Sequence, residues 1–310
     1  MSKSPEVTVI TITRNRAQLL SRAIKSVLNQ SYKLFNYIIV DGASTDDTQN
    51  IVKYFKDERI IYIQQKENLH PVISIDQAVN LTQSKYITFL DDDDEYLPTK
   101  IEKQLDLMET LSEDYGLVYC WMDYFDDTNN KLVREHHPSN RGNIFYHCIE
   151  KQSMGGTPTL FIRRKVYQEV NGWNKNLKYI ADWEFNTRIA RKYLVDYVPE
   201  VLVKVHINHN YERQMISQAK YSSKIRLINQ IDFHNHFLAE FREGFEKYPL
   251  KKSEHLKNLA KLNARLGLVR SSFSKIKEIN QLGIKKAVIF KLALSCTSLL
   301  LRSIFTKYEE

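Results

Sequence analysis

The stretch FLDDDDEYLP, residues 89–98, places five acidic side chains in succession. Crowded carboxylates repel one another and need either water or a cation between them. A divalent cation such as Mg²⁺ uses few protein oxygens and completes its coordination with water and phosphate oxygens. The run therefore allows two interpretations, a solvated acidic turn or a platform for a metal ion and a diphosphate.

The residues around the run alternate between strand and helix patterns. Residues 6–13 are β-branched and mostly apolar, which indicates a buried strand, and apolar residues at helical spacing follow from Leu19 to Leu28. Strand patterns recur in YIIVDGAS, RIIYIQQ, KYITFL and GLVYCWMDYF, with helix patterns between them. After the run, Pro98 suits a first helical turn, and the buried stripe of that helix is Ile101, Leu105 and Met108.

This alternation predicts an α/β fold with a single Rossmann-like, mainly parallel sheet that helices cover on both faces. Ligands of such sheets bind outside the carboxyl ends of the strands. Asp41, in VDGAS, and Asp91 to Asp94 both follow predicted strands, so we expect them at one rim of the sheet. This position favours the platform over the solvated turn.

The second half of the chain continues with the strand TLFIRR, the helices KVYQEV and ADWEFNTRIARKY, and the extended segment VDYVPEVLVKVHI. From about Ile216 the pattern is helical only, with interruptions at Tyr248-Pro249 and at Gly283. We therefore expect a core domain over residues 1–215 and a helical C-terminal extension over residues 216–310.

The cysteines and the N-terminus indicate a reducing compartment. Cys120, Cys148 and Cys296 are odd in number, far apart and form no CxxC pair, which argues against a disulfide framework and against a zinc site. The first apolar run is too short for the core of a signal peptide. We expect the chain to begin here and to stay inside the cell.

The basic charge of the protein belongs to its tail. The net charge is +8, and residues 251–310 hold 13 Lys or Arg against 4 Asp or Glu, or +9, which leaves −1 for residues 1–250. Residues 284–305 are apolar, but the charge-free run Leu292 to Leu301 is too short to span a bilayer. With four basic residues around it, this segment is predicted to lie at an anionic membrane surface, and the alternative is packing on the core domain or on a second subunit.

Six motifs occur in an order that resembles the family 2 inverting glycosyltransferases, whose fold is the A-type nucleotide-diphospho-sugar transferase fold. The motifs are VTVITITRNR, SVLNQSY, VDGASTDDT, KYITFLDDDDEYLP, GGTPTLFIRR and ADWEF. The resemblance covers residues 5–215. It implies that a nucleotide-diphospho-sugar is the donor, with UDP the nucleotide that most relatives use.

Three groups of residues match the donor site of the family. The first-strand loop cradles the nucleotide and corresponds to Thr13, Arg14 and Asn15. Asp41 corresponds to the first aspartate of a base-binding loop, and Gly42 replaces the second one. The DXD-type motif corresponds to the acidic run and implies a Mn²⁺ or Mg²⁺ cofactor.

Within the acidic run, the resemblance implies that Asp93 is the metal ligand, with Asp91 as the second candidate. Asp91 or Asp92 would face the ribose or a bridging water, and the resemblance does not decide between them. Asp94 is expected to orient the loop or to cap the following helix.

The catalytic base of the family lies in a late acidic motif, and Asp182 in ADWE matches it, with Ala181 in place of a glutamate. Glu184 is the second candidate for the base, and the alternative for both acids is a simple helix N-terminus.

Other matches lie near the acceptor and the diphosphate of the family. Gly156 and Thr157 match the loop near the acceptor, and an ordinary turn is the alternative. His206 and His209 lie where relatives have a residue that assists the diphosphate or the metal, and a structural role is the alternative.

The leading hypothesis is therefore a metal-dependent, inverting glycosyltransferase that acts on a hydroxyl of a glycan, lipid-linked, in surface polysaccharide synthesis. It would associate peripherally with the cytoplasmic face of the inner membrane, as a monomer or a homodimer. An inactive family member that acts as a binding subunit is one alternative. A nucleic-acid-binding protein is another, but its only support is the charge of the tail, so we expect no nucleic-acid partner.

Overall fold

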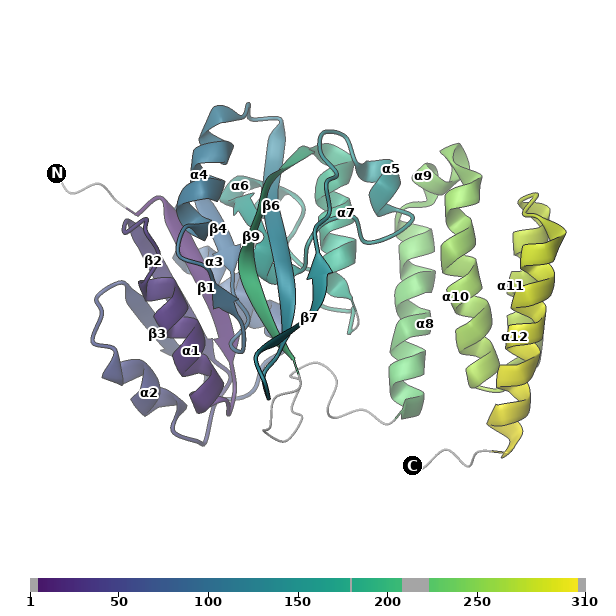
Figure 1. The fold of residues 1–310 in the computed structure, drawn as a ribbon, viewed down its shortest axis with the longest axis horizontal. Coiled ribbons are helices and arrows are strands. Elements are labelled where there is room, and N and C mark those ends of the chain that lie inside the picture. The colour runs from purple at the N-terminus through teal and green to yellow at the C-terminus, as the bar shows by residue number, and fades with distance from the viewer. Residues whose placement is uncertain (1–4, 179, 208–222, 306–310) are drawn as a thin grey trace. The chain divides into compact units, whose positions relative to one another are not determined.

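The computed structural model describes residues 5–178, 180–207 and 223–305 (Figure 1). The chain forms two compact units. The first contains Met1–Ile144, Ser153–Lys175 and Phe185–Arg213, and the second contains Phe145–Gln152, Asn176–Glu184 and Gln214–Glu310. The predicted boundary at residue 215 lies near the last of these divisions, and two earlier segments also belong to the second unit.

The first unit is built on one sheet of nine strands among the described residues, in the order β3-β2-β1-β4-β8-β6-β9-β5, with β7 paired to β6. The strands are β1 (Val7–Thr13), β2 (Phe35–Asp41), β3 (Ile60–Gln64), β4 (Tyr86–Phe89), β5 (Glu95–Tyr96), β6 (Tyr115–Asp126), β7 (Lys131–His136), β8 (Phe161–Arg163) and β9 (Leu194–Ile207). These include every strand that the sequence patterns predict.

The sheet is mixed. The pairs β3-β2, β2-β1, β1-β4 and β6-β9 are parallel, as predicted, whereas β8 runs antiparallel to both β4 and β6. The short strands β5 and β7 also pair in the antiparallel sense. Strand β8 follows a 3₁₀ turn, Thr157–Thr159, rather than a crossover helix, so it is free to run in the opposite direction.

Helices cover both faces of this sheet, as predicted (Figure 1). They are α1 (Ala17–Leu28), α2 (Thr48–Tyr54), α3 (Pro71–Leu81), α4 (Lys100–Thr110) and α6 (Arg164–Glu169). Successive side chains of a strand point to opposite faces. On β1, Val7 and Val9 join the core cluster that contains residues of α1, α2 and α4, whereas the Thr8 hydroxyl contacts Thr82, at the end of α3.

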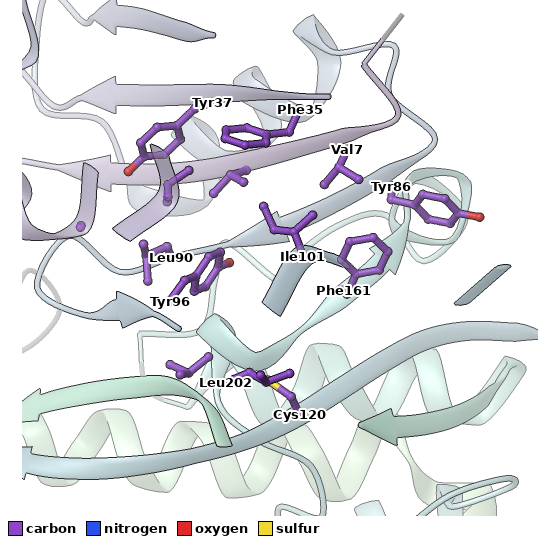
Figure 2. Packing of buried hydrophobic residues seen from close by; sticks show 14 of the residues in the cluster. Val7, Phe35, Tyr37, Tyr86, Leu90, Tyr96, Ile101, Cys120, Phe161 and Leu202 are labelled. Atoms are coloured by element: carbon purple, nitrogen blue, oxygen red, sulfur yellow. The ribbon is translucent and has the colours of Figure 1, made fainter. Parts of the chain in front are cut away.

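The core of the first unit fixes the strands that end at the predicted rim. Figure 2 shows its buried side chains, among them Phe35 and Tyr37 from β2, Ile101 from α4 and Phe161 from β8. Burying one large apolar side chain contributes about 1.5–3 kcal/mol to the free energy of unfolding. A cluster of this size makes the sheet a rigid support for the loops that follow its strands.

The second unit is helical, which confirms the predicted C-terminal extension. Its described elements are α5 (Phe145–Cys148), α8 (Ser223–Glu240), α9 (Arg242–Lys247), the 3₁₀ turn Pro249–Lys251, α10 (Lys252–Arg265), α11 (Val269–Gln281) and α12 (Lys286–Phe305). Helix α7 (Ala181–Lys192) begins in this unit and ends in the first. The predicted interruptions are both present, because Tyr248 precedes the 3₁₀ turn and Gly283, at φ 74°, separates α11 from α12.

Two cores hold the second unit together. One is aromatic and combines Trp183 with four phenylalanines of α8, α9 and the link between them, namely Phe233, Phe237, Phe241 and Phe245. The other is aliphatic and joins α10, α11 and α12 through residues such as Leu256, Ile279 and Leu300. No helix among the described residues has the length and the apolar character needed to cross a bilayer.

Candidate functional site

The loops after β1, β2 and β4 meet at one rim of the sheet. In the β1-β2 pair Thr13 lies opposite Asp41, and in the β1-β4 pair Ile10 lies opposite Phe89, the last residue of β4 and two positions before the acidic run. Because β1 lies between β2 and β4, Asp41 and the acidic run flank the loop that follows β1. The structure therefore places these two predicted site segments at the same rim.

The acidic run folds into a tight turn that is held by the β1 loop. The Asp94 N–H donates to the Asp91 carbonyl over 3.2 Å. The Thr13 hydroxyl donates to Asp92 Oδ2 over 2.7 Å. The two terminal nitrogens of Arg16 reach two carboxylates, with Nη1 at 2.5 Å from Asp92 Oδ1 and Nη2 at 2.8 Å from Asp93 Oδ2.

Arg16 is a site residue that the sequence analysis missed. The motif VTVITITRNR includes Arg16, but only Thr13, Arg14 and Asn15 were assigned to the nucleotide site. A basic residue three positions after the end of a strand, on a rim that also carries an acidic run, was the available signal.

Burial separates the aspartates of the run. The Asp92 and Asp94 side chains are buried, Asp93 is half-buried and Asp91 is exposed. Burial raises the pKa of Asp92 to about 6, although the Arg16 guanidinium opposes this shift. Burial, together with the charges of Asp93 and Asp91, raises the pKa of Asp94 well above its usual value. A cation bound at the rim would oppose both of these upward pKa shifts.

His206, Arg22 and Asp127 form a network of hydrogen bonds and ion pairs with the acidic run. The His206 N–H donates to Asp94 Oδ1 over 3.0 Å, and the two ring nitrogens of His206 lie 2.6 Å from Glu95 Oε1 and 2.9 Å from Asp127 Oδ1. Arg22 donates to Asp127 Oδ1 and to the Asp93 carbonyl. The hydrogen bond from His206 lowers the pKa of Glu95. His206 therefore contacts the carboxylates of Asp94, Glu95 and Asp127. The other predicted histidine, His209, lies outside the described residues.

Asp41 shapes the loop that follows β2. Its Oδ1 accepts hydrogen bonds from the Ser44 N–H, at 2.8 Å, and from the Ser44 hydroxyl, and its Oδ2 accepts one from the Tyr62 hydroxyl. The carboxylate is fully buried. At Gly42, a Cβ atom would lie 3.1 Å from the Asn68 side-chain oxygen, so Asn68 occupies the space beside the position where relatives carry a second aspartate.

The other two residues of the β1 loop differ in their partners. Asn15, at φ 53°, donates its N–H to Ser44 and accepts a hydrogen bond from the Thr45 N–H at 2.7 Å, which ties the two loops together. The buried Nε of Arg14 has no hydrogen-bond partner among the described residues. A buried donor without an acceptor is costly, so this atom is suited to an anionic ligand at the rim.

The two candidate bases lie at the start of α7, within the second unit. Asp182 Oδ2 accepts a hydrogen bond from the Gln152 amide at 3.0 Å, and burial raises the pKa of Asp182. Glu184 is buried and lies 3.5 Å from His236 Nε2. Two residues apart on a helix, these acids lie about 200° apart around its axis. They therefore have separate surroundings, and Asp182 is the more accessible of the two.

The GGTP segment is a compact turn at the start of β8. The Gly156 carbonyl accepts hydrogen bonds from the N–H and the hydroxyl of Thr159, and Thr157 opens the 3₁₀ turn. The structure explains Gly155 best, because a Cβ atom there would lie 2.2 Å from the Thr159 hydroxyl. The predicted residues Gly156 and Thr157 thus form part of a turn whose shape depends on Gly155.

The donor set at the rim fits a divalent cation that a ligand also helps to hold. Among the described residues, no three His, Cys, Asp or Glu side chains are arranged to hold a metal by themselves. Asp93 and Asp91, the two less buried members of the run, offer hard carboxylate oxygens of the kind that Mg²⁺ and Mn²⁺ prefer. Such a cation usually keeps several ligands from water or from substrate phosphates.

Known proteins resemble this chain over most of its length. A relative from Methanocaldococcus jannaschii, the uncharacterized glycosyltransferase MJ1057, is 32% identical over 70% of this chain and 77% of its own. The Escherichia coli glycosyl transferase WcaA, whose name refers to colanic acid biosynthesis, is 29% identical over 81% of this chain and 88% of its own. The chain spans only 34% of a Rickettsia bellii glycosyltransferase to which it is 27% identical.

Two solved structures share the fold at 15% sequence identity. Staphylococcus aureus TarS, residues 1–349, in complex with UDP-GlcNAc, superposes with a TM-score of 0.62 over 89% of this chain and 90% of its own. The mannosyltransferase PcManGT from Pyrobaculum calidifontis, in complex with GDP-Man and Mn²⁺, superposes with a TM-score of 0.57 over 98% of this chain and 88% of its own.

The model of one protein family matches more than half of the chain. It is the model of glycosyl transferase family 2, and the match covers residues 8–170, from β1 to the end of α6. The resemblance found in the sequence is thereby confirmed, and the chain belongs to glycosyl transferase family 2.

Proposed function

We propose that this glycosyltransferase moves a sugar, with inversion, from a nucleotide-diphospho-sugar to a hydroxyl group of a glycan, with the help of Mn²⁺ or Mg²⁺. The observation that carries the proposal is the acidic run at the carboxyl end of β4, which is bonded to the loop that follows β1, and that loop is in turn bonded to the loop that follows β2. The fold neighbours were solved with UDP-GlcNAc and with GDP-Man and Mn²⁺, which supports a donor of this class.

The first step of the proposed reaction is departure of the nucleoside diphosphate. A divalent cation at Asp93 would supply charge stabilisation to the leaving oxygen, and no proton is needed for this. Thr13 fixes the orientation of Asp92, so that this carboxylate limits where the ribose or a bridging water can lie. Arg14 has a buried donor for an anionic group of the ligand.

The second step is attack by the acceptor hydroxyl on the opposite face of the sugar. This step needs a base that takes the hydroxyl proton, and we assign that role to Asp182. Its raised pKa brings its affinity for a proton closer to that required at neutral pH, and Gln152 holds one of its oxygens in place. Glu184 is a poorer candidate because it is buried and faces His236.

A screen of nucleotide sugars tests the donor and the metal together. Purified protein is melted with each of a set of UDP- and GDP-sugars, with Mn²⁺ and with EDTA. At least one donor should raise the melting temperature only with Mn²⁺, because the cation joins the diphosphate to the acidic run. The Asp93→Ala variant should lose this rise.

The matched control for this screen is Asp57→Ala. Asp57 forms a pair with Arg59 in the same unit, just before β3, at the end of the sheet opposite the acidic run. This variant should keep the full response to the donor. The proposal fails if no donor stabilises the protein, or if Asp93→Ala responds like the wild type.

For the acceptor, we propose a lipid-linked glycan at the cytoplasmic face of an anionic membrane, in the synthesis of a surface polysaccharide. Helix α12 carries the support for this. Phe290, Leu294 and Leu301 are exposed, and their spacing of four and seven residues puts them on one stripe. The basic residues Lys286, Lys291 and Arg302 flank the stripe. Helix α12 contains no acidic residue. An apolar stripe with a basic border complements a surface of anionic lipids.

Co-sedimentation with vesicles tests the membrane proposal. The wild type should bind vesicles that contain phosphatidylglycerol more strongly than vesicles of phosphatidylcholine alone. The double variant Phe290→Ser, Leu294→Ser should lose most of this binding, whereas Ser298→Ala, an exposed polar position on the same helix, should not. Equal sedimentation of the wild type and the double variant would refute the assignment. A wild-type dimer that the double variant breaks would show that a second subunit covers the stripe instead.

A further inference from the structure

Arg16 occupies the carboxylate oxygens that the proposed cation would use. Its guanidinium spans two successive carboxylates, Asp92 Oδ1 at 2.5 Å and Asp93 Oδ2 at 2.8 Å. The Arg16 side chain is only 12% exposed, so the charge pairs are partly shielded from water. A planar fork that bridges two acids is a geometry that arginine forms and lysine does not.

The surrounding chain holds Arg16 in this place. Asn15, in a left-handed conformation, is tied to Ser44 and Thr45, and the N–H of Ala17 donates to Asp46 Oδ2 at 3.1 Å. The residues on both sides of Arg16 are thus bonded to the loop that follows β2. The arginine points at the acidic run because its backbone is fixed, and its long side chain can still exchange partners.

The two carboxylates under the guanidinium are not equivalent. Asp92 is 2% exposed and also accepts a hydrogen bond from Thr13, so it holds one end of Arg16 within the protein. Asp93 is 20% exposed, and it is the member that the family match assigns to the metal. Arg16 can therefore keep its contact with Asp92 while it releases Asp93.

We propose that Arg16 is an internal counter-cation of the acidic run, which holds Asp93 until the cation and the diphosphate arrive together. The proposal rests on the metal dependence of the proposed function. A cation alone must displace the guanidinium from Asp93 and gains no phosphate oxygens in return. A cation that arrives with a diphosphate brings anionic oxygens, and these give the displaced end of Arg16 a new partner.

This exchange couples the two ligands. If nucleotide lowers the dissociation constant of Mn²⁺, Mn²⁺ must lower that of the nucleotide by the same factor. Without the guanidinium, the acidic run carries one uncompensated negative charge more, so the cation should bind before the nucleotide. We expect Arg16→Gln to bind Mn²⁺ alone about tenfold more tightly than the wild type, and to lose the part of the coupling that comes from the displacement of Arg16.

Electron paramagnetic resonance of free Mn²⁺, titrated with protein, measures this directly. The full chain is titrated with Mn²⁺ alone and then with Mn²⁺ in saturating UDP, and the series is repeated with GDP. In the wild type, the nucleotide that binds should tighten Mn²⁺ binding at least about tenfold. In Arg16→Gln, the nucleotide should tighten Mn²⁺ binding by a clearly smaller factor than in the wild type, and direct contact between Mn²⁺ and the diphosphate accounts for what remains.

Two further variants make the result specific to Arg16. Arg59→Gln removes an arginine of comparable exposure that pairs with Asp57 before β3, and it should behave as the wild type. Arg16→Lys keeps the charge but not the fork, so its Mn²⁺ affinity should lie between those of the wild type and Arg16→Gln. Because Arg16→Gln leaves Asp92 buried without its cation, it should melt several degrees below the wild type, and Mn²⁺ alone should restore part of this loss.

The outcomes separate this proposal from the proposed function. If Mn²⁺ and nucleotide bind in a coupled manner but Arg16→Gln changes neither the affinity for Mn²⁺ alone nor the coupling, the role of Arg16 is refuted and the enzyme assignment stands. An equal gain of affinity in Arg59→Gln would also refute it, because the effect would then reflect net charge. If Mn²⁺ binds no variant, with or without nucleotide, both the counter-cation role and the metal dependence are wrong.

Discussion

Asp92 and Asp93 are neighbours in the chain but have different surroundings. Asp92 is buried and contacts both Thr13 and Arg16. Asp93 pairs with the same Arg16 guanidinium, but its side chain is partly exposed to water. A run of four identical residues cannot show this division in its sequence. It arises because the turn closed by Asp94 and Asp91 points alternate side chains into the protein.

The pH dependence of the reaction should follow Asp182. A base must be deprotonated to act, and burial raises the pKa of this carboxyl, so the rate should fall as the pH drops through the raised pKa. The fall should begin at a higher pH than the usual carboxyl range predicts. A profile of kcat/KM against pH, with the best donor and acceptor, measures it.

The variant Asp182→Asn should lower kcat by about 10²- to 10⁴-fold, because the side chain can no longer accept a proton. It should still bind the donor with Mn²⁺, since the donor residues lie in the loops of the first unit. The matched variant Glu184→Gln should lower stability more than activity, because Glu184 is buried beside His236. Full activity of Asp182→Asn would assign the base to another residue, and loss of donor binding would show that Asp182 does more than take a proton.

The elements at the rim show which parts of the fold a sequence can predict. The strands, the helices and the rim were predicted because their patterns are local and because parallel strands share one ligand-binding end. The antiparallel strand β8 and the pairing of β5 with β9 were not, since strand partners are chosen by packing. The Arg16 and His206 contacts join residues 76 and 111 positions apart, and no local pattern encodes them.

The helical unit contains a buried histidine pair with a defined proton arrangement. His255 Nε2 must donate to the Ile149 carbonyl, at 2.8 Å, so a neutral His255 has a bare Nδ1. That Nδ1 lies 3.0 Å from Nδ1 of His234 and accepts a hydrogen bond from the His234 Nδ1–H. A proton on both Nδ1 atoms would break this hydrogen bond, and His255 also stacks on Trp183 and Phe237 in the aromatic core.

This pair should make the protein sensitive to acid. Burial lowers the pKa of His255 to about 4, and burial with the neighbouring His255 lowers that of His234 to about 3, with Glu254 opposing. In the unfolded chain both groups bind protons below about pH 6.5. The folded state binds none there, so stability is complete above pH 6.5 and is lost as the pH falls towards 4, by on the order of 2 kcal/mol per histidine.

Melting curves of the full chain between pH 7.5 and pH 5 test the histidine pair. The melting temperature of the wild type should fall over this range, and the double variant His234→Leu, His255→Leu should show a smaller fall, from a lower starting value. The control His147→Gln changes an exposed histidine of the same unit and should follow the wild type. If the double variant keeps the full pH dependence, other groups cause the acid sensitivity.

Across the whole molecule, the family and the mixed α/β fold with its helical C-terminal part are established, and the proposed metal and diphosphate site lies at one rim of the sheet. Six short motifs sufficed to identify the family because their order along the chain is specific, although each is weak alone. The donor sugar and acceptor are decided by side chains around the bound sugar, and no motif specifies these. The basic tail has a structural counterpart in α12, and its exposed apolar stripe is the basis of our proposal of a lipid surface as the partner.

The central claim is that the acidic run binds the metal and the donor diphosphate. The rate of donor hydrolysis tests it most directly, measured by chromatography of the released nucleotide for the donor that stabilises the protein best. With Mn²⁺ the wild type should release nucleoside diphosphate, and both EDTA and Asp93→Asn should slow this release at least about 100-fold. A wild-type rate in Asp93→Asn, or a rate that EDTA leaves unchanged, would contradict the account.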